Sequence, residues 1–285
     1  QMPVEECGNM LIMEAAIALA SKNMSFANEH FDLLESWVKY LVENGKDPEN
    51  QLCTDDFAGH LAHNCNLSLK AIMGLQGMSM IFDMLEDKEK SAYYRQEAEK
   101  MAENWLNTAV NEDGSTRLTF DSTDGFSMKY NMVWDKVWNT GLFTQEFREN
   151  ELENNKKHFN KYGLPLDSRA DYTKSDWLVW VASMASTKEL FEEFMMEIEG
   201  KGTCRVSAED TFFATRTALS ARESDITSSN HGVSFATAGF IIPSRTNRAR
   251  GIPLQDTCFF RGKPGNHILN KHAGRQTVTS AVLIH

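Results

Sequence analysis

The sequence has 285 residues, of which 41% are hydrophobic and 24% charged, a balance that excludes a chain disordered throughout. Its formal net charge is -11, so we expect no nucleic-acid partner, because no basic face would offset phosphate repulsion over most of the length. Five scattered cysteines exclude a disulfide scaffold, and no apolar run approaches the length that spans a bilayer, so we expect no membrane partner.

Apolar and amphipathic helices are predicted to alternate along the first 200 residues. In each pair the first segment is mostly apolar and the second is charged on one face. The pairs cover residues 9–23 with 26–45, 67–85 with 90–110, 127–143 with 144–163, and 177–186 with 187–200. This alternation predicts inner helices that are covered on all sides and outer helices that are half exposed. No repeated consensus links the pairs, which favours a closed α/α toroid over a solenoid.

The composition changes after about residue 200. Residues 1–200 are predominantly acidic, whereas the rest is basic, rich in Ser, Thr, Arg and Asn, and poorly periodic. We therefore predict a helical domain over residues 1–199 and an atypical, irregular segment over 200–285 that is disordered or derives from a shifted reading frame. The chain opens abruptly, without an initiating Met, which indicates an internal fragment.

Polar connections precede the apolar helices, and in a toroid such connections lie at one end. The densest is LCTDDFAGHLAHNCN, residues 52–66. The sequence therefore predicts a rim rich in carboxylates. Our candidate catalytic residues are Glu5, Glu6, Asp55, Asp56 and Asp171, and our candidate substrate-binding residues are His60, Asn64, Lys129, Asp135, Asp167, Arg169 and Trp177.

Most of these candidates also have a structural interpretation. Paired carboxylates in a cleft suit proton transfer, but an Asp before a helix also suits an N-cap. Arg169 could hold a substrate carboxylate or close a salt bridge within its own loop, and Trp177 could pack in the core or stack on a sugar. His60 and His63 offer two metal ligands without a firm third, so we predict no metal and no other cofactor.

No nucleophile motif is visible in the sequence. GxSxG is absent, and Ser68 and Ser175 lack a recognisable Ser-Lys framework. Cys7, Cys53 and Cys65 are near histidines in sequence, but nothing in the sequence indicates that any of them is activated.

Four motifs carry a resemblance to a known family. MPVEECGNM, LCTDDFAGHLAHNCNLSLKAI, KYNMVWDK and KYGLPLDSRADYTKSDWLVW resemble the glutaminase A family of fungal secreted enzymes and bacterial homologues, over residues 2–199. The resemblance implies an incomplete (α/α)6 domain of the kind found in many glycosidases, β-rich N-terminal domains that are missing here, and an extracellular or periplasmic location. Cys7 departs from the family's EESGNM pattern, and the usual closing Asp-Trp-Tyr element and Gly-rich segment are not found after residue 200.

Three functions follow from this resemblance. The family implies a hydrolase that converts L-glutamine to L-glutamate and ammonia, with rim carboxylates and Arg169 in binding and proton transfer. The fold implies an alternative, a glycoside hydrolase in which Glu5 or Glu6 pairs with Asp55, Asp56 or Asp171 across the toroid mouth. The third is a non-catalytic fragment. The expected partners are therefore a small-molecule or glycan substrate and the missing N-terminal domains.

Overall fold

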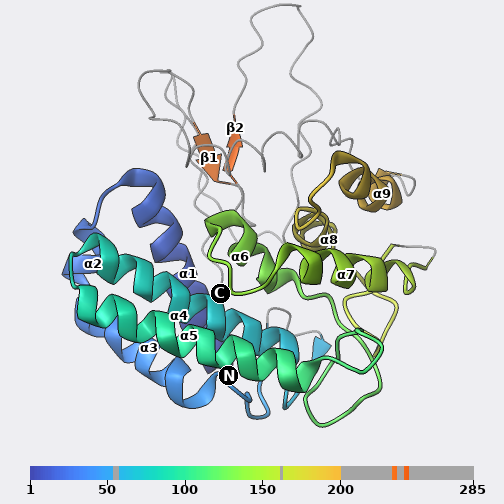
Figure 1. The fold of residues 1–285 in the computed structure, drawn as a ribbon, viewed down its shortest axis with the longest axis horizontal. Helices are drawn as coiled ribbons and strands as arrows, with labels where there is room; N and C mark the ends of the chain where they lie inside the picture. Colours follow the sequence, from blue (N-terminus) through green and yellow to red (C-terminus); the bar gives the residue numbers. More distant parts are fainter. Residues whose placement is uncertain (54–57, 161–162, 200–232, 236–240, 244–285) are drawn as a thin grey trace, which may run out of the picture.

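The computed structural model describes residues 1–53, 58–160, 163–199, 233–235 and 241–243. Four helix pairs follow one another up to residue 199, so the predicted all-α class is confirmed for this region (Figure 1). The pairs are α1 (Pro3–Ser21), joined by the short α2 (Ser25–Glu29) to α3 (Phe31–Asn44); α4 (Cys65–Met84) and α5 (Lys88–Ala109); the 3-10 helix η2 (Tyr130–Met132) with α6 (Val133–Trp138) and α7 (Gln145–Lys156); and α8 (Ser175–Ala182) and α9 (Lys188–Glu199).

Helix α4 lies inside this arrangement. Every residue from Cys65 to Ser79 is buried, which explains why its sequence is apolar on all sides. Helices α1, α3, α5 and η2 all contact it. The indole Nε1 of Trp105 on α5 donates to the backbone oxygen of Cys65 at 2.8 Å, which fixes α5 along α4.

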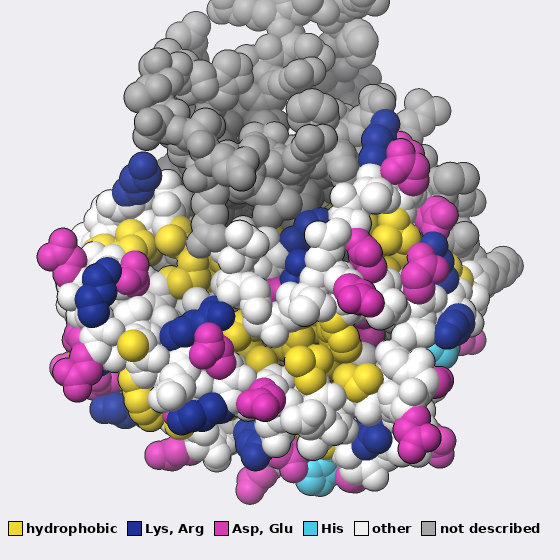
Figure 2. Space-filling view, viewed as in Figure 1, with side chains coloured by type: hydrophobic (Ala, Val, Ile, Leu, Met, Phe, Trp, Pro, Cys, Tyr) yellow, Lys and Arg dark blue, Asp and Glu magenta, His cyan; other side chains and the backbone are white. Residues whose placement is uncertain are grey.

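The outer helices bury one face each. Helix α3 buries Leu34, Val38 and Leu41, at the spacing of three and four residues that the sequence predicts. Helix α5 likewise buries an apolar stripe that includes Tyr94 and Trp105. Acidic and basic side chains are interspersed over the described part of the face in Figure 2. The predicted division into inner and outer helices therefore holds for α4 against α3 and α5, whereas the predicted inner helix α1 leaves Met13 and Ile17 exposed.

Glycine allows α1 and α4 to approach closely. A Cβ atom at Gly8 of α1 would lie 2.6 Å from Cγ of Lys70 on α4, far closer than two carbon atoms pack. Because Gly8 has no side chain, the stem of Lys70 can pass against α1 and reach its first turn. Helix packing thus places a buried amine beside Glu5.

Two boundaries differ from the sequence prediction. Helix α1 begins at Pro3 rather than at residue 9, because a proline fits the first turn, where its missing N–H is not needed. The third inner helix is shorter than residues 127–143, since α6 ends at Asn139 in a left-handed conformation with φ of 50°. Before it, residues 126–128 run antiparallel to residues 166–168, with Met128 N donating to Leu166 O at 2.8 Å.

Beyond residue 199 the structure describes two short strands, β1 (Val233–Phe235) and β2 (Ile241–Pro243). They pair antiparallel, with Val233 opposite Pro243. The predicted disorder or frame shift after residue 200 otherwise concerns residues outside the described part of the chain. Among the described helices, none is both long and apolar enough to cross a membrane.

Candidate functional site

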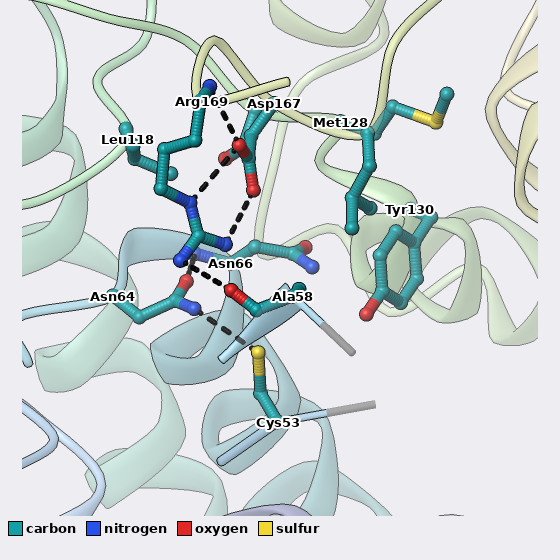
Figure 3. A pocket seen from close by; sticks show the side chains of 11 residues that line it. Cys53, Ala58, Asn64, Asn66, Leu118, Met128, Tyr130, Asp167 and Arg169 are labelled. Carbon is teal, nitrogen blue, oxygen red and sulfur yellow. Dashed lines mark hydrogen bonds and ion pairs between the residues drawn. The ribbon is translucent and has the colours of Figure 1, made fainter. Parts of the chain in front are cut away.

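A small pocket lies beside the N-terminus of α4 (Figure 3). Its volume is about 20 Å³, which is on the scale of one water molecule. Three polar connections meet here, those that lead into α4, η2 and α8. The lining residues are Cys53, Ala58, Asn64, Asn66, Leu118, Ser127, Met128, Tyr130, Leu166, Asp167 and Arg169.

Asn64 links the helix to the pocket. Its Oδ1 accepts from the backbone N–H groups of Asn66 at 2.9 Å and Leu67 at 3.1 Å, so Asn64 is the N-cap of α4. Its Nδ2 donates to Sγ of Cys53 at 3.4 Å. The cap therefore holds the amide in one orientation and directs its N–H group at the thiol.

Asp167 and Arg169 form a two-pronged ion pair on one wall. Nη2 of Arg169 donates to Oδ2 of Asp167 at 2.6 Å, and Nε donates to Oδ1 at 3.0 Å. This contact raises the pKa of Arg169. Nη1 of Arg169 also donates to the backbone oxygen of Ala58 at 3.0 Å (Figure 3), which ties the connection before α8 to the one before α4. The structure thus contains the loop salt bridge that is one of the two interpretations of Arg169.

Glu5 and Lys70 form a second ion pair, between α1 and α4. Nζ of Lys70 donates to Oε1 of Glu5 at 2.6 Å and to Oδ1 of Asn9 at 2.6 Å. Nδ2 of Asn9 also donates to Oε1 of Glu5, at 3.0 Å. The two charged side chains are only 3% and 4% exposed, so this is a buried, hydrogen-bonded pair.

The thiol of Cys53 is influenced by both ion pairs. Burial raises its pKa to about 11, and the negative charge of Glu5 acts in the same direction. Lys70 and Arg169 oppose this shift, and Asp167 adds to it. Because the thiolate is the reactive form of cysteine, Cys53 is not an activated nucleophile at neutral pH.

Lys129 lies fully buried behind the pocket. Its Nζ donates to the backbone oxygen of Ser127 at 2.8 Å and to the hydroxyl oxygen of Ser127 at 2.9 Å. Burial lowers the pKa of this lysine, and Glu151, Cys65 and Asp167 oppose the shift. Lys129 therefore contacts a pocket-lining hydroxyl without lining the pocket itself.

An aromatic pair supports another wall. Tyr130 lines the pocket and stacks on Trp177 of α8, with ring centroids 5.1 Å apart and an angle of 9° between the planes. Trp177 is buried, and Nζ of Lys174 lies 5.1 Å from its ring centroid. Trp177 thus contributes to the site through Tyr130 and does not itself line the pocket.

Four of the other predicted site residues are described and do not line this pocket. Glu6 is exposed on α1, and Asp171 is exposed, accepting from Nδ2 of Asn160 at 3.4 Å. His60 lines a separate polar hollow of about 400 Å³ with residues such as Tyr40. Asp135 is buried at the junction of α6 and α7, where it accepts from Leu142 N at 2.8 Å and pairs with Arg148. Asp55 and Asp56 lie outside the described residues.

Sequence reasoning missed several groups at this pocket. Lys70 has a visible signal, since it is the one lysine in the apolar segment 67–85. Ser127 precedes Lys129 by two residues and matches no motif, whereas Tyr130 lies within KYNMVWDK but is not among the candidate residues. The pairing of residues 126–128 with 166–168 brings Ser127 to Asp167. Within the described residues, no group of three or more His, Cys, Asp or Glu side chains could hold a metal ion.

Comparison with known proteins gives concordant matches. The family model of the glutaminase A six helical-hairpin domain matches residues 1–237. Glutaminase A of Aspergillus oryzae is 34% identical over 198 residues, which cover 68% of this chain and 29% of that protein. A protein of Arthroderma benhamiae named as a probable glutaminase is 29% identical over 189 residues, 56% of this chain and 22% of that protein. The chain thus spans less than a third of either relative.

Proposed function

Because this chain belongs to the glutaminase A six helical-hairpin family, we propose that it carries the site of a hydrolase that converts L-glutamine and water to L-glutamate and ammonia. One observation carries the proposal: the ion pair of Asp167 with Arg169 lines the small pocket, and a second buried pair, Glu5 with Lys70, is near enough to act electrostatically on Cys53, which also lines it. A free amino acid presents a carboxylate and an ammonium group together. A site that offers both signs of charge suits such a ligand.

Arg169 is the group that we assign to the α-carboxylate of the substrate. Within the described residues, three of its five N–H donors are engaged, two by Asp167 and one by Ala58, and the other two are available to a ligand. Its side chain is 28% exposed, whereas that of Asp167 is 3% exposed. Asp167 therefore orients the guanidinium, and Arg169 meets the substrate at the pocket mouth.

The small volume of the pocket suits the other end of the substrate. A cavity of about 20 Å³ admits a small polar group but not a whole amino acid. The side-chain carboxamide of glutamine would enter it, among the polar side chains of Asn66 and Ser127. The predicted catalytic roles of Asp55 and Asp56, as an acid or base or in binding a polar substrate, belong to the same proposal.

A glycoside hydrolase is the second candidate, because Tyr130 at the pocket has an aromatic face and is backed by Trp177. It ranks below the amidase for a structural reason. Glu5 and Asp167 are each bonded to a cation, which suits the binding of charge better than protonation of a glycosidic oxygen. The family resemblance also supports β-rich N-terminal domains as partners and a site of action outside the cytoplasm, and we include both in the proposal.

Release assays on the purified protein test this function. We expect ammonia from L-glutamine and no reducing sugar from a glycan panel. Arg169→Met should raise KM roughly tenfold to a hundredfold and leave kcat nearly unchanged, because a clamp on the non-reacting end binds ground state and transition state alike. Arg95→Met, which removes an arginine paired with Glu99 on α5, is the control and should change neither constant. Sugar release, or a KM indifferent to Arg169→Met, would overturn the proposal.

A further inference from the structure

Ser127 is a hydroxyl held in a fixed place at the pocket. It lines the pocket and is only 5% exposed. Its residue bridges Asp167 in the antiparallel pairing of residues 126–128 with 166–168, so its backbone cannot rotate freely. The proposed carboxamide subsite and this hydroxyl are therefore in the same small volume.

Lys129 is close enough to exchange a proton with that hydroxyl. The Nζ to Oγ distance is 2.9 Å, and a second contact of 2.8 Å to the Ser127 backbone oxygen fixes the amine. Within the described residues, Lys129 forms no salt bridge of 4.0 Å or less with a carboxylate. If the amine loses its proton, the same 2.9 Å contact can reverse, with the hydroxyl donating to the nitrogen lone pair.

We propose that Ser127 is the nucleophile of this amidase and Lys129 its general base, an inference that rests on the proposed function. Oγ of Ser127 forms a bond to the carboxamide carbon while its proton passes to Nζ of Lys129. The C–N bond then breaks, and the same proton moves to the departing nitrogen, which leaves as ammonia. Water attacks the resulting ester, gives a proton to Lys129, and Ser127 recovers that proton as glutamate departs.

Asn66 supplies the donor that this reaction needs for the developing oxyanion. It lines the pocket, and its side chain extends toward the interior in Figure 3. Its Oδ1 is oriented by the backbone N–H of Asn131 at 3.5 Å, and its backbone oxygen accepts from Nδ2 of Asn131 at 2.9 Å. These contacts leave Nδ2 of Asn66 as an N–H group in the pocket that Ser127 also lines.

A general base must be unprotonated, and the surroundings of Lys129 favour its neutral amine form. Burial is the largest effect on its pKa and lowers it. The acidic groups that face it are Glu151 of α7, Cys65 of α4 and Asp167 before α8, and they act in the opposite direction. The net shift is downward, so more of the amine is neutral at a given pH than in an ordinary lysine.

Variants of the two residues test the proposal. Ser127→Ala and Lys129→Met should each lower kcat for ammonia release by about a thousandfold or more, as loss of a nucleophile or its base does. Ser79→Ala removes a hydroxyl that is also 5% exposed but bonds Ser91 on α5, and it should keep full activity. Lys136→Met removes another lysine, half-buried, that donates to backbone oxygens, and it should also remain active.

A covalent probe identifies the nucleophile in the wild-type protein, whether or not the variants fold. The wild-type protein is treated with 6-diazo-5-oxo-L-norleucine, a glutamine analogue whose diazoketone alkylates a nucleophile as nitrogen gas leaves, and its peptides are then mapped by mass. We expect the adduct on Ser127 and labelling at least tenfold slower in Lys129→Met. This mapping uses the native protein, so it decides the question even if a variant fails to fold.

The outcomes distinguish the two proposals. A wild-type protein that releases no ammonia from glutamine overturns the proposed function and this inference with it. Ammonia release that survives Ser127→Ala, or an adduct that maps to another residue, overturns only the inference. Loss of activity in both variants, retention in both controls and an adduct on Ser127 would establish the pair.

Discussion

At the scale of single residues, burial decides which groups at the pocket carry charge and which do not. Burial raises the pKa of Cys53 and lowers that of Lys129. Asp167 and Arg169, in contrast, form an ion pair with each other. The sequence alone indicates neither an activated cysteine nor a serine motif. In the structure, burial holds the thiol of Cys53 protonated, and the hydroxyl of Ser127 has the amine of Lys129 at 2.9 Å.

Cys53 should react slowly with thiol reagents. With a pKa of about 11, its thiolate fraction at pH 8 is roughly two hundred times smaller than that of an ordinary cysteine. Alkylation by iodoacetamide, followed by peptide mass mapping, should therefore accelerate about tenfold per pH unit from pH 8 to 10. A rate that levels off below pH 9 would show that the thiol is more acidic than its surroundings imply.

At the scale of elements, the site is built where helix ends and their connections meet. Helices α1 and α4 supply Glu5 and Lys70, and the connections before η2 and α8 supply Ser127 and Asp167. Chain order alone predicts that the connections converge. It does not predict which side chains point inward, because that depends on the pairing of residues 126–128 with 166–168.

The Glu5–Lys70 pair should couple α1 to α4. Lys70→Met leaves a buried carboxylate without its cation, and we expect a loss of about 3–5 kcal/mol in the free energy of unfolding. Lys88→Met is a matched control, since Lys88 also pairs with a residue of α4, Asp83, but at the surface with 72% and 60% exposure. It should cost less than about 1 kcal/mol. Urea denaturation measures both, and equal losses would contradict the argument.

At the scale of the whole molecule, the helical pairs could be predicted from the sequence, because each pair repeats an apolar segment followed by a segment with one apolar face. The apolar segment 67–85 is covered on every side, and the segment 26–45 shows one apolar stripe. The short α6 was not predicted, although Asn139, which tolerates the left-handed conformation, and Gly141 two residues later are signals that a helix ends. The predicted boundary near residue 200 and the closed toroid stay predictions.

Because of Lys136, the free energy of unfolding should depend on pH in the alkaline range. Lys136 joins the third and fourth helix pairs by donating to the backbone oxygens of Ser183, at 2.9 Å, and Ala185. Burial lowers its pKa to about 8, below its value in the unfolded chain of about 10.4. Between these values the unfolded state binds more protons, so stability rises with pH.

The measurement is a difference between two proteins. Urea midpoints of wild type and Lys136→Met are compared at pH 7.5 and 9.5, so that other titrating groups cancel. The wild type should gain stability relative to the variant at the higher pH. If the difference in urea midpoint between the two proteins is unchanged or smaller at pH 9.5, burial does not destabilise the charged form of Lys136.

The antiparallel contact of residues 126–128 with 166–168 has a consequence for how this chain tolerates length changes. Because strand side chains alternate, a shift of one residue would turn Ser127 and Asp167 to opposite faces. A single-residue insertion or deletion between this contact and η2 should therefore be as damaging as loss of either side chain. Residues added near Gly114, an open turn with free space around it, should be accommodated.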